Sequence, residues 1–352
     1  MQEEAEKKDD MIRCTKSLKR LSLFIALCIS ISFCLILFPR LSGKTKKNLK
    51  IKAKPPSKRD YIDDKLHDGF FVHEFDASYQ RKNFSEEEIQ KPRVFLGNEK
   101  KIKQLHNECV PLDTWGGTTP ICIYDPQEDR MISAFIKDKR TWEQNLLNAT
   151  SAILLSHPEL TFVDLGSNIG AYTITAAKLG RRVFAVDIME DSLTLLKHSL
   201  DLGKIRDNVT LVLNAISDTR SQFRVNVVEH NIGGSHIKEI DAVKDKDIIP
   251  VQSILMNDLL ALNIPRNVFV KMDIEGTELR AFQGGGRFFD QLNVKYLLME
   301  WMLHRSKAKT AKAIIHFLLS NGMLPYRDHE QKLPLPHGGY VYWPDNVFWI
   351  KR

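Results

Sequence analysis

The sequence predicts an α/β fold with a doubly wound, mainly parallel, Rossmann-like sheet in its C-terminal half. From residue 161 onward, short apolar runs typical of buried strands alternate with segments of helical periodicity. Such alternation is typical of a parallel sheet with helices on both faces. The chain has 352 residues, 43% of them apolar, which is enough for a core of this size. Ligands of such sheets bind at the carboxyl ends of the strands.

The expected elements follow one another at regular intervals. Strands are expected at 162–165, 183–186, 209–213, 254–262, 268–272, 296–299 and 347–350. Helices are expected at 169–179, at 192–202, from 277 and at 307–319. Residues 61–155 have an irregular pattern and are expected to form a lead-in of short strands and loops, or a small subdomain. Residues 156–352 then form the main domain.

An uncharged stretch of eighteen residues, 21–38, lies near the N-terminus. Lys16, Lys19 and Arg20 precede it, and a proline and an arginine follow it. Eighteen apolar residues just span a bilayer. Since no small-residue cleavage site follows, the pattern favours an uncleaved transmembrane signal-anchor over a cleaved signal peptide or a buried helix.

The net charge of +7 belongs to the N-terminal part of the chain. Residues 1–60 hold 15 Lys and Arg against 6 Asp and Glu, whereas residues 61–352 hold 36 against 38. A nearly neutral folded part offers no basic face, so a nucleic-acid partner is not expected. Residues 1–20 form a short tail before the anchor, and the lysine-rich residues 39–60 are expected to form an extended stalk.

The orientation of the anchor depends on observations that point in different directions. Within about twenty residues, 6 Lys and Arg precede the segment and 9 follow it, which favours a cytosolic domain. The densest cluster, however, abuts the N-terminal end, and long domains translocate regardless of loop charge. Cys109 and Cys122 either form a disulfide in an oxidising lumen or remain thiols. Three glycosylation sequons begin at Asn83, Asn148 and Asn208. We expect a single-pass type II protein with a lumenal domain in the Golgi or endoplasmic reticulum.

The most informative stretch, residues 163–173, reads VDLGSNIGAYT and joins a strand to a helix through a glycine-bearing turn. Asp187 ends the next strand, where an acid accepts hydrogen bonds from ribose hydroxyls. A glycine turn with an acid suits a dinucleotide or S-adenosylmethionine. The G-x-N-x-G spacing, with Asp164 ahead of it, departs from the dinucleotide pattern G-x-G-x-x-G. It favours S-adenosylmethionine, whose amino-acid end carries an ammonium group.

A second block, residues 270–284, reads VKMDIEGTELRAFQG and follows the strand expected at 268–272. Alternation along the chain predicts Lys271, Asp273 and Glu275 on one side. Methylation of an alcohol requires removal of its proton, for which a base or a metal ion is useful. Asp273 is the first candidate for the base. Glu275 shares this role, holds a divalent cation together with Asp273, or caps the following helix.

The two motifs together resemble the FkbM family of S-adenosylmethionine-dependent methyltransferases. Members of that family show a V-D-x-G-A-N-x-G turn and a later K-x-D-x-E-G-x-E-x-x-x-L-x-G block. The resemblance covers about Asp164 to Trp301, with Ser167 where Ala is usual and Asp187 where Glu followed by Pro is common. It implies methyl transfer to oxygen, often of a sugar or another secondary hydroxyl. The cofactor-binding residues it implies are Asp164, Gly166, Asn168 and Gly170 at the methionine end and Asp187 at the ribose. The stretch from Asn214 to Asp218, with Ser217, either lines the adenine or ribose edge or is an ordinary turn.

The sequence leaves the roles of several other polar and aromatic residues open. Glu300 and His304 follow the strand expected at 296–299, at the sheet edge where substrates bind, and each is a candidate contact for the acceptor. His304 is alternatively a helix-capping or surface residue. Glu278 is expected to be an ordinary charge in the first turn of a helix. The glycine loop at 231–235 is able to close over a substrate. The stretch at 340–346 forms either a sugar-stacking platform or packing.

These observations predict a membrane-anchored, S-adenosylmethionine-dependent O-methyltransferase that acts on glycan hydroxyls in the secretory pathway. Its catalytic residues are Lys271, Asp273 and Glu275, and a divalent metal is compatible with the two acids but not required by the pattern. One alternative is a cytosol-facing O-methyltransferase for small molecules or lipids. Another is a membrane-tethered protein that keeps the fold without turnover. A nicotinamide oxidoreductase is disfavoured by the spacing of the glycine turn.

Overall fold

The structure is a computed structural model that describes residues 89–352 except 98, 106, 241–249 and 331. The expected tail, anchor and stalk at residues 1–60 lie outside the described residues, as does the sequon at Asn83. In the part of the chain that the structure describes, no helix has the length and apolar character needed to cross a membrane.

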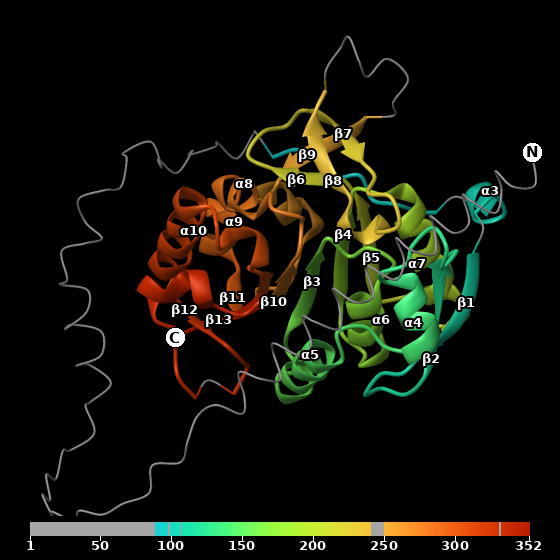
Figure 1. The fold of residues 1–352 in the computed structure, drawn as a ribbon, viewed down its shortest axis with the longest axis horizontal. Helices are drawn as coiled ribbons and strands as arrows, with labels where there is room; N and C mark the ends of the chain where they lie inside the picture. Colours follow the sequence, from blue (N-terminus) through green and yellow to red (C-terminus); the bar gives the residue numbers. More distant parts are fainter. Residues whose placement is uncertain (1–88, 98, 106, 241–249, 331) are drawn as a thin grey trace, which may run out of the picture. The chain divides into compact units, whose positions relative to one another are not determined.

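A seven-stranded sheet lies at the centre of the described residues. Its strands are β3 (Thr161–Leu165), β4 (Val183–Asp187), β5 (Val209–Leu213), β10 (Asn267–Met272), β11 (Asn293–Glu300), β12 (Met323–Tyr326) and β13 (Asn346–Lys351). They are ordered β12-β13-β11-β10-β3-β4-β5 (Figure 1). β13 runs antiparallel to both of its neighbours, and the pairs from β11 to β5 are parallel. The prediction of an α/β fold with a mainly parallel sheet is confirmed.

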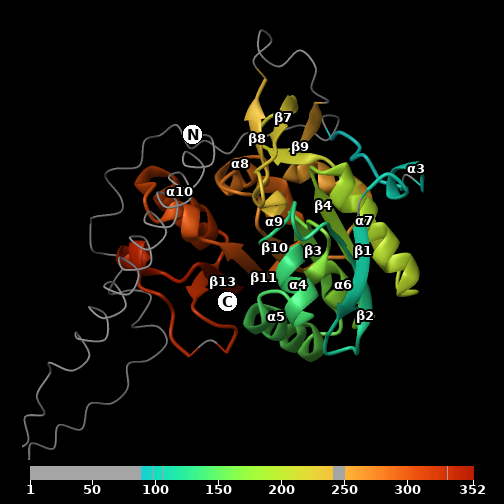
Figure 2. The same cartoon turned by 45° about the vertical axis from the view of Figure 1, so that its right-hand side comes forward.

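The central strands are largely apolar because helices cover both faces of the sheet. Along β3, Phe162 packs into one core while Val163 and Leu165 pack into the other, as the two-residue period of a strand requires. One face is covered by α5 (Gln144–Ser156), α6 (Ala171–Lys178) and α7 (Glu190–Leu202). The other is covered by η3 (Met256–Leu262), α8 (Glu278–Gln283), α9 (Gly286–Gln291) and α10 (Ala308–Ser320). Figures 1 and 2 show the two groups on opposite sides of the sheet.

The strand order reverses between β3 and β10. From β3 the chain continues outward to β4 and β5, and from β10 it continues in the opposite direction to β11. The register pairs Lys271 with Asp164 and Met272 with Leu165, so both strands end at the same level. A reversal of this kind opens a crevice at the carboxyl ends of the strands. Both sequence motifs therefore end beside one crevice.

The lead-in contains more helix than its irregular pattern predicts. A hairpin of β1 (Asn107–Leu112) and β2 (Thr119–Tyr124) is preceded by the short α3 (Glu99–Ile102) and followed by α4 (Ser133–Lys139) and then α5. Cys109 lies opposite Cys122 in the hairpin and is bonded to it, so the disulfide alternative is confirmed. The apolar side chains of β2, α4 and α5 pack into the same core as α6 and α7, and burial against the sheet outweighs the weak local pattern.

A second sheet has the order β6-β9-β7-β8, with β6 at Ala215–Ser217, β7 at Gln222–Asn226, β8 at His236–Glu239 and β9 at Val251–Leu255. The long strand expected at 254–262 is wrong, because the chain leaves β9 and enters η3. The carboxylate of Asp258 accepts the Leu255 amide at 2.8 Å and pairs with Arg220, which stabilises the turn. Short 3₁₀ turns η2 (Ile232–Gly234), η4 (Met302–His304) and η5 (His337–Tyr342) complete the elements, and β12 is a strand that the sequence analysis did not predict.

Candidate active site

A cavity of about 310 Å³ lies at the carboxyl edge of β3, β4 and β10, within the size range of ligand sites. The turn after β3 forms its floor, together with the ends of β4 and β10 and the start of β6. The lead-in, the glycine loop at 231–235 and the two residues that follow this loop form further walls of the cavity. The backbone of Arg130 donates to the carbonyl of His230 at 3.0 Å, which joins these two walls. The structure thus brings both sequence motifs and the glycine loop to one cavity.

The glycine turn is tight because two of its residues have no side chain. Gly166 and Gly170 have φ of +80° and +92°, which disfavours any residue with a Cβ. A Cβ on Gly166 would lie 1.7 Å from the carbonyl oxygen of Asp273, and one on Gly170 would lie 2.1 Å from Cδ1 of Leu196. Both glycines and Asn168 line the cavity, where the sequence analysis places them.

Asp187 organises the floor of the cavity. Its carboxylate accepts the backbone amide of Asn168 at 2.7 Å and that of Met189 at 2.8 Å. Burial raises the pKa of Asp187, and these amides and the Lys271 charge oppose that shift. Each carboxylate oxygen keeps a second lone pair for a further donor. Asp187 is therefore placed to accept hydrogen bonds from ribose hydroxyls, as predicted for this position.

Asp164 lies near the end of β3, just before the glycine turn. Its side chain is fully buried and does not line the cavity. One carboxylate oxygen accepts the Thr173 hydroxyl at 2.6 Å, and the other has no hydrogen-bond partner among the described residues. Burial raises the pKa of Asp164 to about 6, against the opposing charge of Lys271. Asp164 thus lies behind the turn and supports it, and its contact with the methionine end of the cofactor stays a prediction.

Ser217 is likewise outside the cavity. It belongs to β6, which turns from the main sheet into the second one, and its hydroxyl donates to Asp218 at 3.1 Å. Its role in cofactor binding stays a prediction. Asn214, from the same predicted stretch, lines the cavity, and its amide group is tied to the backbone of Arg93 at 2.7 Å and of Gln252 at 3.0 Å.

Lys271 is buried beside the predicted base. Its Nζ lies 3.1 Å from Oδ2 of Asp273, 3.5 Å from the carbonyl oxygen of Gly166 and 4.9 Å from the ring centre of Tyr172. Burial alone would lower the pKa of Lys271, but nearby carboxylates, Asp273 foremost, outweigh it and raise the pKa. Lys271 is therefore a permanent positive charge that pairs with Asp273.

Glu275 lies at the cavity wall without a hydrogen bond to any described residue that would fix its carboxylate. Its backbone is left-handed, with φ of +57°, which is uncommon for a residue with a side chain. Burial, followed by the charges of Asp273 and Glu278, raises the pKa of Glu275 to about 7. It does not cap α8, so that alternative is excluded.

Glu278 makes the contacts that were considered for Glu275. One of its oxygens accepts the amides of Ile274 and Gly276 at 3.1 and 3.3 Å, and the other lies 2.9 Å from Nε2 of His304. Both side chains of this pair are fully buried. The predictions of an ordinary helix charge for Glu278, and of a surface, capping or acceptor-binding role for His304, are wrong. The pair holds the turn that presents Glu275.

The end of β11 contributes one more acid. Glu300 lines the cavity, and burial together with the charge of Asp273 raises its pKa to about 8. The aromatic stretch that follows does not line the cavity. Trp343 is buried against Trp301 with ring centres 4.8 Å apart, whereas Tyr342 is 85% exposed. Packing is therefore the role of Trp343.

A hydrogen-bonded pair of polar cavity residues was not predicted by the sequence analysis. The Tyr172 hydroxyl, at the start of α6, donates to Oε2 of Glu143 at 2.7 Å, and both residues line the cavity. Glu143 stands directly before α5, in the irregular lead-in, and nothing in the local pattern distinguishes it from a helix-capping acid. Tyr172 lies inside the first motif, but its position near the start of the expected helix predicts a side chain packed in the core.

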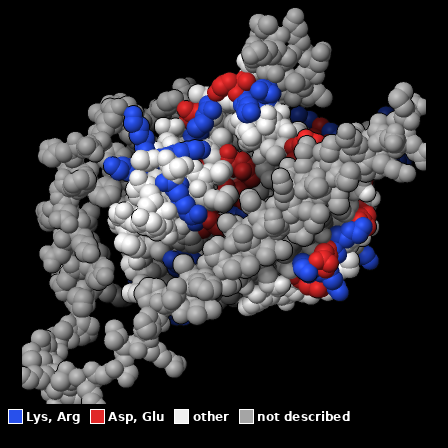
Figure 3. Space-filling model, viewed as in Figure 1, with Lys and Arg blue, Asp and Glu red and all other residues white. Residues whose placement is uncertain are grey.

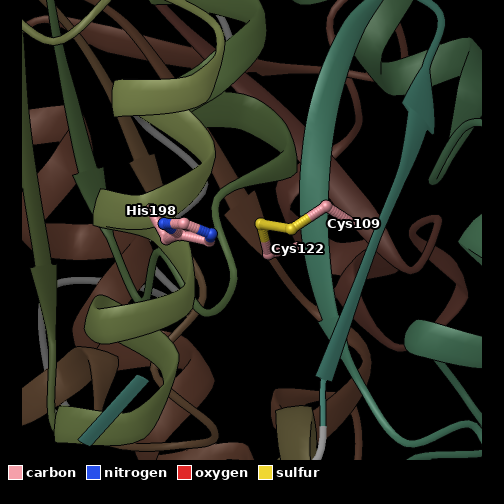
Figure 4. Close-up of side chains that lie close together, drawn as sticks. All are labelled: Cys109, Cys122 and His198. Carbon is pink, nitrogen blue, oxygen red and sulfur yellow. A yellow bond between two sulfur atoms is a disulfide. The ribbon is translucent and has the colours of Figure 1, made fainter. Parts of the chain in front are cut away.

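Three side chains of the described region have potential metal-ligand atoms within 4.8 Å of one another: Cys109, Cys122 and His198. Figure 4 shows the His198 ring on α7 directed toward the disulfide of the hairpin. Thiolates bind metals, and the two sulfurs are bonded to each other. In the disulfide form this group is not a metal site.

Comparison with known proteins identifies the central segment. Residues 164–325 match the family model described as the methyltransferase FkbM domain. A search of the curated proteins found no match.

The chain is also similar to solved structures of low sequence identity. Precorrin-6y C5,15-methyltransferase from Geobacter metallireducens GS-15 is 15% identical, with 60% of this chain and 92% of that chain covered and a TM-score of 0.30. A putative methyltransferase from Streptococcus mutans in complex with SAH is 14% identical, with coverages of 57% and 97% and a TM-score of 0.31. Magnesium protoporphyrin IX methyltransferase from Synechocystis PCC 6803 with bound SAH is 14% identical, with coverages of 63% and 89% and a TM-score of 0.32. The assignment therefore rests on the family match and on both motifs at one cavity: residues 164–325 match the methyltransferase FkbM domain, and we assign the chain to the S-adenosylmethionine-dependent methyltransferases.

Proposed function

We propose that the protein transfers a methyl group from S-adenosylmethionine to a hydroxyl of a glycan in the secretory pathway. The observation that carries the proposal is the single cavity in which the glycine turn and Asp187 lie beside Asp273, Glu275 and Glu300. The first group suits the cofactor and the second suits an alcohol that must lose its proton.

The cavity residues fit the cofactor by their chemistry. S-adenosylmethionine supplies a methyl group bound to a positively charged sulfur. The oxygen nucleophile attacks the methyl carbon, and S-adenosylhomocysteine leaves. Asp187 accepts the ribose hydroxyls, and Ile188 and Ile216 line the same region with apolar surface suited to an adenine. Gly166 and Gly170 keep the floor free of side chains. No pyrophosphate-binding G-x-G-x-x-G turn is present in residues 163–173, which disfavours a dinucleotide.

Glu275 is the better candidate for the base. The carboxylate of Asp273 is already engaged, because Oδ2 pairs with the Lys271 ammonium group at 3.1 Å. The pKa of Glu275, raised to about 7, matches the requirement that a base be ionised at neutral pH and still hold a proton. Glu275 accepts the proton of the attacking hydroxyl, and the Lys271–Asp273 pair holds the adjacent wall in place.

The charge of the cavity favours a neutral acceptor. Asp273, Glu275 and Glu300 face a single buried lysine, Lys271, and acidic side chains gather near the centre of the face drawn in Figure 3. Raised pKa values leave Glu275 and Glu300 only partly charged at neutral pH. Lys271 is already paired with Asp273, so the described lining residues offer no other lysine or arginine to a phosphate or carboxylate, whereas the carboxyl groups hydrogen-bond to hydroxyls. Neutral sugars meet this requirement. The disulfide of the hairpin supports an oxidising compartment, where glycans are modified.

The full chain, made in cells with its N-terminal segment, provides the test. Microsomes containing the protein are supplied with methyl-labelled S-adenosylmethionine, and the N-glycans are then released enzymatically. Label in the glycan fraction, absent with the Asp187→Ala and Glu275→Gln variants, is the expected result. Label confined to lipids or small molecules would overturn the glycan assignment. Calorimetry with S-adenosylhomocysteine and NADH tests the cofactor, and a folded protein that binds neither would overturn methyl transfer itself.

A further inference from the structure

A carboxylate from outside the FkbM domain reaches the cavity. Glu143 is in the lead-in, and its side chain lines the cavity together with Tyr172 from the first turn of α6. Oε2 accepts the Tyr172 hydroxyl at 2.7 Å. Oε1 forms no hydrogen bond with any described residue. One oxygen is thus oriented by a buried tyrosine while the other is available to a ligand.

The backbone of Glu143 is held in an unfavourable conformation. Its φ of +40° and ψ of +51° are left-handed, a region that is uncommon for residues with a side chain. Glu143 is the N-cap residue of α5, a position where a short polar side chain normally caps the helix, and its own side chain makes no capping hydrogen bond. The conformation turns the carboxylate to the cavity at the expense of the cap.

The surroundings of Glu143 match the methionine end of the proposed cofactor. Tyr172 follows the glycine turn by two residues, whereas Asp187 marks the ribose end on β4. Burial raises the pKa of Glu143, and the charge of Lys271 and the Tyr172 hydroxyl oppose that shift. A carboxylate in this environment gains from a bound cation, because ion pairs strengthen where water is excluded. Asp164, the acid predicted for this role, is buried behind the turn.

We infer that Glu143 binds the α-ammonium group of S-adenosylmethionine, with Tyr172 orienting its carboxylate. This inference rests on the proposed function and extends it to a residue outside the matched domain. The lead-in thus takes part in cofactor recognition as well as covering the sheet.

Two probes that differ only at the methionine end test this role in the full chain. S-adenosylhomocysteine carries the amino-acid group, and 5′-methylthioadenosine has the same adenosine thioether without it. Loss of a charge-assisted hydrogen bond predicts that Glu143→Gln weakens binding of S-adenosylhomocysteine by about 10- to 100-fold. Binding of 5′-methylthioadenosine is expected to change by less than about 3-fold. Asp187→Asn is the matched control, because it removes a ribose contact and weakens both probes.

The variants also separate recognition from folding. Tyr172→Phe is expected to weaken binding of S-adenosylhomocysteine less than Glu143→Gln does, and to leave the affinity for 5′-methylthioadenosine unchanged. Equal losses for the two probes with Glu143→Gln, or no loss for either, would overturn the inference while the proposed function stands. Wild-type protein that binds neither probe would overturn the proposed function together with the inference. Thermal unfolding of each variant verifies that it is folded at the temperature of titration.

Discussion

The carbonyl oxygen of Asp273 lies directly over Gly166, so closely that a Cβ at position 166 would stand 1.7 Å from it. The amide of Asp273 also donates to the carbonyl of Leu165 at 3.0 Å. The turn after β3 and the turn after β10 are therefore packed backbone against backbone. The cofactor floor and the acidic wall form one rigid unit, in which displacement of one turn displaces the other.

Gly166→Ala is expected to disrupt both turns. The substitution adds the cost of a left-handed alanine, about 1 to 2 kcal/mol, to a clash with backbone that cannot rotate away. Gly180→Ala is the matched control, because Gly180 has φ of +73° and no atom within 4 Å of its added Cβ. Denaturant unfolding and S-adenosylhomocysteine titration measure the two effects. A Gly166→Ala protein as stable as the control, with intact affinity, would contradict the packing described here.

Asp164 predicts a specific dependence of stability on pH. Its pKa is about 6 in the folded protein and about 3.9 in an unfolded chain, so the folded state binds more protons between these values. Its contribution to the free energy of unfolding is therefore greatest below pH 4 and falls by about 3 kcal/mol in total as the pH rises through about 6, with about 2 kcal/mol of this loss between pH 4.5 and 7.5. Asp164→Asn removes this dependence. Urea unfolding measures this at pH 4.5 and 7.5. The free energy of unfolding of the variant, relative to that of the wild type, should be higher at pH 7.5 than at pH 4.5. A difference between the two proteins that does not change with pH would contradict this role of Asp164.

Glu275 and Asp273 are expected to respond differently to neutralisation. Glu275→Gln should lower the rate of methyl transfer by about 10²- to 10⁴-fold and leave S-adenosylhomocysteine affinity nearly unchanged. In the wild type the rate should rise with pH through about 7, as Glu275 ionises, and then level off. Because the Asp273 charge raises the pKa of Glu275, Asp273→Asn should move this midpoint to lower pH. An active Glu275→Gln variant beside an inactive Asp273→Asn variant would instead identify Asp273 as the base.

The two described sequons should differ in occupancy if the domain is lumenal. Asn208 is exposed just before β5. Asn148 is half-buried in α5, where its amide oxygen accepts the Trp115 indole at 2.9 Å. A glycan is therefore expected on Asn208 and little on Asn148. Mass spectrometry of cell-made protein, before and after glycosidase treatment, measures both, with Asn208→Gln as the control. Unmodified Asn208 would count against a lumenal address.

The main sheet could be predicted because its signals are local. Residues 209–213 are apolar at every position that the two faces bury, and they form β5 as expected. The prediction of a strand over 254–262 is wrong because Asp258 stabilises a turn by pairing with Arg220, a partner 38 residues away. Helix α5 in the lead-in has few local signals and depends on burial against the sheet.

The amino-acid sequence by itself determined most strands of the main sheet, the glycine turn with Gly166 and Gly170, and the position of Asp187, since each depends on neighbouring residues. Only the tertiary structure decided which acids reach the cavity. Asp164 and Glu278 lie within the motifs, yet burial and local partners keep them from it. Glu143 lies outside the motifs, and packing of the lead-in brings it to Tyr172. Side-chain direction depends on contacts between distant segments, which local periodicity does not record.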